Sequence, residues 1–415
     1  MEGRPSRRDV LKAGAGVAAG GALASSGLSP ALLRAIAATQ ATCGTLADVR
    51  NVVIFIQENR SFDHYFGRYK GVRGFDDRSV RLSNTDDGTT IFKQSYPIDG
   101  IPGAPDPLLP FHINTSEPST SQGECTNDIG HQWSDQHAMW NDGLMDSWVA
   151  RYLQSNPGGN GKFAAITMGY YQGSPARDHS GDVDLYWALA DNFTVCDNYF
   201  CSIKGPTTPN RLYHWTGTID PSGHAGGPVV GCPSAYPTAK EPKLDWMTYP
   251  ERLQDQGISW RIYASDEMGS GSSDEDRWVG EFGCNPLWLF KNYQDALTST
   301  LPRDIELVDR ASLRTQWQPN SGQGTDPAHV LAKFVADCAP GGNLPKVSWV
   351  IAPGGYSEHP KSRPVDGAAF IETMLQGIWA DPELWSKTVV LINYDEHDGF
   401  FDHVIPPTAP SGAPD

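Results

Sequence analysis

The strongest constraint on the fold is a set of short, apolar, β-rich runs that each stop abruptly at polar residues. They cover residues 52–56, 258–263, 347–351 and 388–392. Near-continuous apolar runs of this length are typical of strands covered on both faces, as in a parallel sheet. Helices are expected between them, including 186–191, 249–256 and 368–379. The sequence therefore predicts an α/β fold, a sandwich with a mostly parallel central sheet.

Two of these runs end at adjacent oxygen-bearing side chains. Glu58 and Asn59 follow the first run, and Asp395 and Glu396 follow the last. Ligands of open α/β sheets bind outside the carboxyl ends of the strands, and carboxylate and amide oxygens hold divalent metals. We therefore expect a divalent metal ion here, of a kind that an oxygen-rich set leaves open among calcium, manganese, magnesium and zinc. The alternative for each pair is an ordinary strand-end cap or surface salt bridge.

A hydroxyl-bearing turn is the second candidate for chemistry. Residues 205–211 read GPTTPNR, which places Thr207 on a tight backbone and Arg211 four residues later. A hydroxyl beside a metal can attack phosphorus, and an Arg fork matches phosphate oxygens. The spacing by itself equally fits an ordinary proline-bracketed turn.

Two histidines are candidates for metal binding or proton transfer. His131 lies among large aromatic residues, and His359 follows the third apolar run. Imidazole can bind metal, donate to a phosphate oxygen or protonate a leaving alkoxide. A structural histidine is the alternative at each position.

The first 37 residues indicate export. Arg7 and Arg8 form a twin-arginine pattern, a weakly apolar stretch follows, and residues 35–37 (AIA) offer a cleavage site. We expect residues 1–37 to be a signal peptide read by the twin-arginine translocase, and the protein to be secreted or held in the cell wall or periplasm. The alternative is a disordered basic N-terminus. Residues 45–407 would form one catalytic domain and 408–415 a Pro/Gly-rich tail.

The net charge narrows the classes of partner. The chain carries −17, and because residues 1–37 carry +3 the remainder carries −20. A surface this negative repels nucleic-acid backbones and anionic lipids. It is compatible with zwitterionic lipids or small soluble phosphates, and we expect no nucleic-acid partner.

Long motifs extend from residue 57 to residue 404. They are QENRSFDHYFG (57–67), GECTND (123–128) leading into HQW (131–133), MGYY (168–171), PNRLY (209–213) and DEHDGFFDHV (395–404). In these motifs the chain resembles the bacterial phosphoesterase family that contains the phospholipases C and a related acid phosphatase, and the GEC stretch is most similar to actinobacterial phospholipases C. Asp398 stands where the family usually has Gly. Family members normally continue beyond this Pro-rich end, which leaves open whether the domain is complete.

The resemblance implies an alkaline-phosphatase-like three-layer sandwich and assigns roles to residues. It aligns Thr207 with the nucleophile, although Thr208 is its neighbour. It aligns His131 and His359 with histidines that contact the phosphoryl or leaving group, and we expect Arg211 to bind phosphate oxygens. The remaining aligned residues are the family's metal ligands: Glu58, Asn59, Asp395 and Glu396.

The implied activity is hydrolysis of phosphatidylcholine-type phospholipids to diacylglycerol and phosphocholine. The substrate would be phosphatidylcholine or sphingomyelin, met in transient contact with a membrane surface. An aromatic cage would suit the choline ammonium group. Two alternatives stay open: a phosphomonoesterase of the same family, and a non-catalytic exported binding protein. The cage candidates are Trp133, Trp140, Tyr170 and Tyr171.

Overall fold

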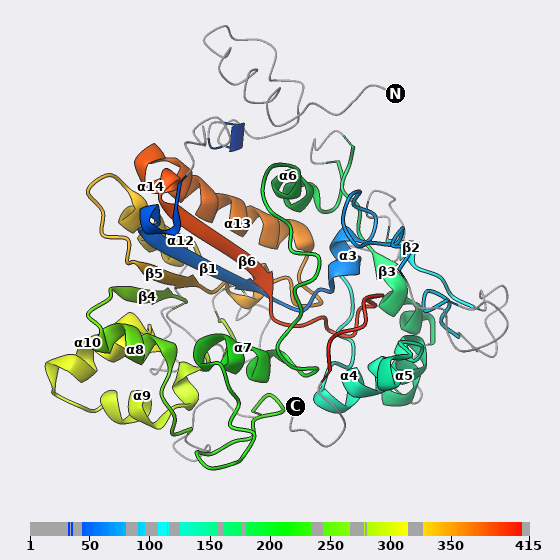
Figure 1. Cartoon of the computed structure of the whole chain (residues 1–415), viewed down its shortest axis with the longest axis horizontal. Helices are drawn as coiled ribbons and strands as arrows, with labels where there is room; N and C mark the ends of the chain where they lie inside the picture. Colours follow the sequence, from blue (N-terminus) through cyan, green and yellow to red (C-terminus); the bar gives the residue numbers. More distant parts are fainter. Residues whose placement is uncertain are drawn as a thin grey trace, which may run out of the picture.

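The computed structural model is drawn in Figure 1. It describes residues 32–33, 35, 44–79, 90–95, 107–113, 115, 125–156, 161–175, 180–233, 244–265, 278, 280–313 and 327–408. The signal peptide predicted for residues 1–37 therefore lies outside the described residues, apart from Leu32, Leu33 and Ala35.

A four-stranded parallel sheet forms the centre of the fold, in the order β4-β5-β1-β6. Each predicted run forms one of these strands. The expected helices become α6 (Asp184–Asn192), α8 (Tyr249–Asp255) and α13 (Pro364–Trp379). This confirms the predicted α/β fold with a parallel sheet. The strands are β1 (Asn51–Gln57), β4 (Trp260–Tyr263), β5 (Val347–Val350) and β6 (Thr388–Tyr394), and a separate parallel pair is formed by β2 (Phe111–His112) and β3 (Gly169–Tyr170).

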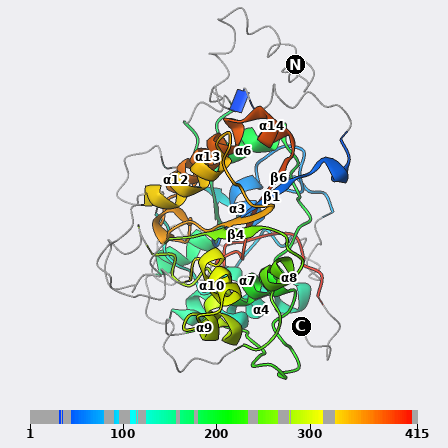
Figure 2. The same cartoon turned by 90° about the vertical axis from the view of Figure 1, so that its left-hand side faces the viewer.

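Helices cover both faces of the sheet, so the architecture has three layers (Figures 1 and 2). One face carries α6 (Asp184–Asn192), α12 (Pro327–Cys338), α13 (Pro364–Trp379) and α14 (Pro382–Ser386). The other carries α7 (Thr207–Thr216), α8 (Tyr249–Asp255), α9 (Lys291–Ala296) and α10 (Pro302–Arg310). The remaining helices are α3 (Phe62–Phe66), α4 (Trp133–Trp140) and α5 (Trp148–Ser155), with 3-10 turns at Leu46–Asp48, Asn141–Gly143, Gly161–Met168, Pro286–Leu289 and Gly354–Tyr356.

The two cores follow from the alternation of side chains along each strand. Val53 and Phe55 of β1 pack into the first helical layer, whereas Ile54 and Ile56 pack into the second. Because successive side chains of a strand point to opposite faces, an unbroken apolar run supplies both layers at once. This is why the strands read as continuous apolar segments.

A third cluster lies beyond the carboxyl end of β6, where α4 and α5 pack with Phe400 and Phe401. It holds the segment after β6 against the segment that contains His131. The register pairs Gln57 with Tyr394 at the ends of β1 and β6. The polar residues that follow these two strands therefore emerge side by side. None of the helices in the described part of the chain has the length and apolar character of a membrane span.

We predict that Phe55 is a dominant contributor to stability. Its side chain is fully buried, and its ring lies 5.9 Å from that of Phe370 on α13. Phe55→Ala should lower the free energy of unfolding by about 3–5 kcal/mol, because the cavity it leaves adds to the lost apolar transfer. Urea unfolding followed by circular dichroism measures this. Leu46→Ala, at a side chain that is 91% exposed, is the control and should change stability by less than about 0.5 kcal/mol. Equal effects of the two changes would contradict the assigned core.

Candidate active site

The site forms where β1 and β6 end. Glu58 and Asn59 follow β1 directly, and Asp395 and Glu396 follow β6. The backbone N–H groups of Asn59 and Glu396 both donate to Asp395 Oδ1, at 3.3 and 2.8 Å. The structure thus brings together the four residues that the resemblance aligns with metal ligands, and all four are buried.

Asn59 connects three segments of the site. Its backbone is left-handed (φ 54°), a conformation that asparagine tolerates better than most residues. Its side-chain Oδ1 accepts a hydrogen bond from Thr207 Oγ1 at 3.4 Å, and its Nδ2 donates to Asp398 Oδ1 at 3.0 Å. The end of β1 is therefore linked to the start of α7 and to the loop after β6.

Thr207 is the first residue of α7, a ten-residue helix that follows Pro206. The N-terminus of a helix offers unpaired N–H groups and a partial positive charge, which suit a phosphate. Thr208 has a buried side chain, whereas Thr207 is half-buried and touches Asn59. This arrangement favours Thr207 over its neighbour as the residue that faces a substrate.

Arg211, one turn further along α7, lies beneath the carboxylates with 1% of its side chain exposed. Its Nε donates to Asp395 Oδ2 at 2.9 Å and one Nη to Glu58 Oε1 at 3.2 Å. The other Nη donates to the carbonyl of Cys284 at 3.2 Å. All of these donors are directed at protein acceptors, so the geometry suits a counter-charge for the acids more than the phosphate fork that the spacing suggested. Burial raises the pKa of Asp395, and the guanidinium opposes that rise.

The two histidines approach each other across Asp398, and their ring centroids lie 5.9 Å apart. Asp398 Oδ1 lies 2.9 Å from His131 Nδ1 and 4.0 Å from His359 Nε2, and its Oδ2 accepts the N–H of Ile129 at 2.9 Å. Burial alone would lower the pKa of His131, but the carboxylates of Glu396 and Asp398 raise it to about 12. These carboxylates therefore favour the protonated form of His131.

Glu396 has the features of an unsatisfied cation ligand. Its Oε2 accepts from the N–H of Asp398 at 2.6 Å and from Gln136 Nε2 at 3.2 Å. Its Oε1 is buried without a hydrogen-bond partner among the described residues. Burial raises the pKa of Glu396 far above its usual range. The charge of His131 opposes this rise, and the charges of Asp398 and Asp395 add to it.

The charge balance of the site fits a bound cation. Four buried acidic side chains lie beside the cations of Arg211 and His131, and burial raises the pKa of two of them, Asp395 and Glu396. Buried charge is costly unless it is paired, so a divalent ion would favour the ionised forms of these acids, and an oxygen donor set suits a hard cation. A neighbouring set with mixed nitrogen and oxygen donors, whose ligand atoms all lie within 4.8 Å of one another, also has the composition of a metal site. The carboxylates are Glu58, Asp395, Glu396 and Asp398, and the neighbouring set is Asp128, His131, His359 and Asp398.

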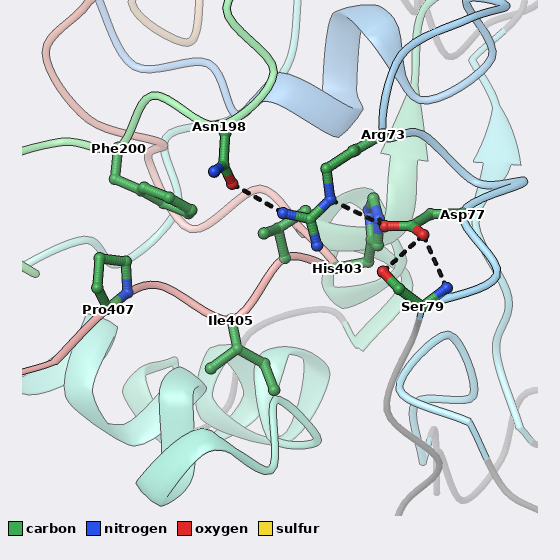
Figure 3. A pocket seen from close by; sticks show the side chains of 9 residues that line it. Arg73, Asp77, Ser79, Asn198, Phe200, His403, Ile405 and Pro407 are labelled. Atoms are coloured by element: carbon green, nitrogen blue, oxygen red, sulfur yellow. Dashed lines mark hydrogen bonds and ion pairs between the residues drawn. The ribbon is translucent and has the colours of Figure 1, made fainter.

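Two cavities among the described residues differ in whether they reach the acid cluster. A cavity of about 190 Å³ is lined by Arg211, Asp395 and Tyr199 among others, so it reaches the acid cluster. A larger one, of about 360 Å³, surrounds His403 and the ion pair of Arg73 with Asp77 (Figure 3). None of the site residues predicted from the sequence lines the larger cavity. Its size therefore does not identify it as the active site.

Two of the four aromatic residues expected to form a choline cage have contrasting environments. Trp133 is 37% exposed. A Cβ placed on Gly205 would lie 3.8 Å from the Trp133 ring. Tyr171 is fully buried, and its ring packs 4.8 Å from that of His64. Trp133 thus lies beside the turn that presents Thr207, whereas Tyr171 belongs to the core.

Several residues of the site were not singled out from the sequence. Asp398 was noted only as a departure from the family pattern. Its place in the DEHDG stretch was the available signal, because it follows Asp395 by one short turn. The others that we did not identify in advance are Arg60, Asp128, Gln136 and Glu358.

Comparison with known proteins agrees with this geometry. Residues 49–415 match the phosphoesterase family. The chain is 40% identical to "Non-hemolytic phospholipase C" of Burkholderia pseudomallei (98% of this chain, 52% of the relative) and 37% identical to "Hemolytic phospholipase C" of Pseudomonas aeruginosa (97% and 50%). It is 35% identical to "Phospholipase C B" of Mycobacterium tuberculosis H37Rv (100% and 70%), so the expected actinobacterial relatives are present, although the Burkholderia protein is more similar by identity.

The chain spans about half the length of the first two of these relatives. At the other end, residues 4–24 match the twin-arginine translocation pathway signal sequence, which confirms the expected export by that pathway. The match from residue 49 onward covers the sheet, the acid cluster, α7 and both histidines. The chain therefore belongs to the phosphoesterase family.

Proposed function

We propose that this chain is a metal-dependent phospholipase C that hydrolyses phosphatidylcholine-type phospholipids through Thr207. The observation that carries the proposal is the contact of Thr207 with Asn59 at the N-terminus of α7, beside a cluster of buried carboxylates. The names of the relatives support phospholipid as the substrate class. Phosphatidylcholine and sphingomyelin share the phosphocholine group, and both would be met at a membrane surface.

Each set of site residues would have its own role in the reaction. Glu58, Asn59, Asp395 and Glu396 would hold the divalent cation. When bound there, the ion supplies positive charge that favours the alkoxide of Thr207 and stabilises phosphoryl oxygens. Arg211 would keep the carboxylates in place from below, a role that its hydrogen bonds to Glu58 and Asp395 support.

Hydrolysis would proceed in two steps. The Thr207 alkoxide attacks phosphorus, the bond from phosphorus to the diacylglycerol oxygen breaks, and His359 gives that oxygen a proton. His131, held as a cation by Asp398, stabilises the charge of the phosphoryl group. Water then attacks the phosphocholine-threonine intermediate and gives a proton to His359. The bond from phosphorus to the Thr207 oxygen breaks, which restores the alkoxide, and phosphocholine leaves.

Headgroup recognition would involve Trp133. A quaternary ammonium is attracted to the face of an aromatic ring, and Trp133 is the partly exposed aromatic residue beside the Thr207 turn. Its ring stacks on that of His137 at 3.7 Å between centroids, which fixes the orientation of the indole.

The nucleophile is tested by mass spectrometry of the purified protein after brief incubation with phosphatidylcholine. We expect a phosphocholine-sized adduct on the wild type and on Thr208→Ala, and none on Thr207→Ala. Thr207→Ala should also lower kcat by about 10⁴-fold or more, since removal of a nucleophile abolishes the covalent route. An adduct that disappears only in Thr208→Ala would transfer the role to that residue. Ligand binding without turnover in the wild type, unchanged in Thr207→Ala, would instead support a binding protein.

The cation is tested by chelation. Treatment with EDTA should abolish turnover, and adding back calcium, manganese, magnesium and zinc one at a time should restore it with at least one of them. Glu396→Gln should lower metal affinity by about 10–100-fold or more, as removal of a charged ligand is at least as costly as removal of an outer partner. Calorimetric metal titration measures this, with Glu306→Gln on α10 as the matched control. Full activity of a metal-free preparation would contradict the proposed site.

The substrate class is tested by comparing kcat/KM on phosphatidylcholine liposomes with kcat/KM on a soluble phosphomonoester. We expect the diester to be preferred, because the exposed Trp133 provides a surface for the choline group. A higher kcat/KM for the monoester would replace the phospholipase with the phosphomonoesterase alternative. Trp133→Ala should reduce the preference for phosphatidylcholine over phosphatidylethanolamine, which lacks the quaternary ammonium.

A further inference from the structure

A second buried carboxylate lies next to His359, outside the contacts of the proposed reaction. Glu358 has no exposed surface, and its oxygens accept four hydrogen bonds. Tyr65 Oη and Tyr394 Oη donate to Oε2 at 2.6 and 3.0 Å, and Gln57 Nε2 donates to Oε1 at 3.1 Å. The hydroxyl of Tyr186 also donates to Oε1. The carboxylate is satisfied entirely by uncharged donors.

These donors come from different parts of the fold. Gln57 and Tyr394 end the two central strands β1 and β6, Tyr65 lies on α3, and Tyr186 lies on α6. Glu358 therefore ties the loop after β5 to the sheet edge and to one helical layer. Buried polar groups with complete hydrogen bonding fix a single arrangement, because any displacement leaves several groups unpaired.

The backbone at Glu358 is also held in an unusual state. Its φ of 67° is left-handed, which is uncommon for a residue with a long side chain. The Glu358 carbonyl accepts from Arg60 Nε at 2.7 Å, and another guanidinium nitrogen of Arg60 donates to the carbonyl of Ser362 at 3.2 Å. Gly367 of α13 packs so closely that any Cβ there would collide with the Glu358 side chain.

His359 depends on this backbone for its position. Among the described residues, its ring has one hydrogen-bonded contact, from Nδ1 to the carbonyl of Pro360 at 3.2 Å, and its Nε2 lies 4.0 Å from Asp398. About a third of the side chain is exposed. A ring with so few contacts of its own is placed by the residue before it.

We propose that Glu358 is a positioning residue for His359, which it holds at the Thr207 site through the left-handed turn that its buried hydrogen bonds maintain. The inference rests on the proposed function, in which His359 protonates the leaving oxygen. A purely structural role for Glu358 predicts a different result. It would lower activity equally for every substrate, because only the fraction of folded protein would change.

The leaving group separates these outcomes. Phosphatidylcholine releases an alkoxide that needs a proton, whereas p-nitrophenyl phosphorylcholine releases a phenolate that does not. General acid catalysis contributes roughly 10²–10⁴-fold when the leaving group needs it. The second step is common to both substrates, so the comparison uses kcat/KM, which reports the steps up to release of the leaving group. Glu358→Gln should lower kcat/KM on phosphatidylcholine by about 100-fold, with a much smaller loss on the nitrophenyl ester. Tyr65→Phe, which removes one donor, should give a weaker effect in the same direction.

His359→Ala should reproduce this selective loss, and the double variant Glu358→Gln/His359→Ala should be no worse than His359→Ala alone. Tyr293→Phe is the matched control, since it removes a buried tyrosine hydroxyl that bonds to Thr248 at 2.8 Å in the opposite core. Thermal unfolding of each variant establishes that it is folded.

Three results would overturn the inference. Equal losses on both substrates, or losses that add in the double variant, would assign Glu358 to stability alone. A wild-type chain that is folded and metal-loaded but turns over neither ester would overturn the proposed function and this role with it. An active wild type with non-selective variants would overturn only the role of Glu358.

Discussion

The ion pairs of Arg211 are the constraint on which the site depends. Its guanidinium is almost completely buried and contacts Glu58 and Asp395, which follow different strands. Two carboxylates at the ends of adjacent parallel strands would repel each other in this low-dielectric environment. The buried cation on α7 allows them to stay close. Because Thr207 lies one turn earlier on the same helix, the interaction that stabilises the acids also places the hydroxyl beside them.

A second buried guanidinium extends the same organisation to the histidines. Arg60 donates to the carbonyls of Glu358 and Ser362 and, at 3.2 Å, to the hydroxyl of Thr126. It thereby links the end of β1 to the loop that carries His359 and to the segment that leads into His131. The strand that supplies Glu58 and Asn59 is thus joined directly to both histidine-bearing segments. Arg211 fixes the acids, and Arg60 fixes the segments that carry His131 and His359.

The sequence predicted the parts of the fold that depend on local pattern. Unbroken apolar runs such as 388–392 revealed strands with two covered faces, and the residues after them were expected at one edge of the sheet. The parallel pairing of β1 and β6 then made the meeting of Glu58 with Asp395 a geometric consequence. The selection of Thr207 instead relied on the family motif, because a proline-bracketed turn has no distinctive periodicity.

The parts that were not predicted depend on contacts between distant segments. Arg60 and Glu358 are separated by 298 residues, and each is unremarkable among its neighbours in the chain. The burial of Arg211 was likewise hidden, since an Arg after a Thr turn suits a phosphate and a buried carboxylate equally well. Which acceptor it meets is decided by the packing of α7 under the sheet edge, and no local pattern contains that information.

Asp398 gives the two histidines different chemical characters. Its carboxylate contacts His131 closely and, with Glu396, raises the pKa of that imidazole to about 12. An imidazole whose protonated form is favoured by two neighbouring carboxylates gives up its proton reluctantly, which suits it to stabilise charge on a phosphoryl oxygen more than to transfer a proton. His359 lies further from the same carboxylate and is partly exposed. It has access to solvent protons that the buried pair lacks, so His359 suits the proposed proton transfer to the leaving oxygen better than His131 does. In the proposed mechanism the two histidines therefore have different roles. The buried network centred on Glu358 then serves to hold His359, a histidine that has few contacts of its own.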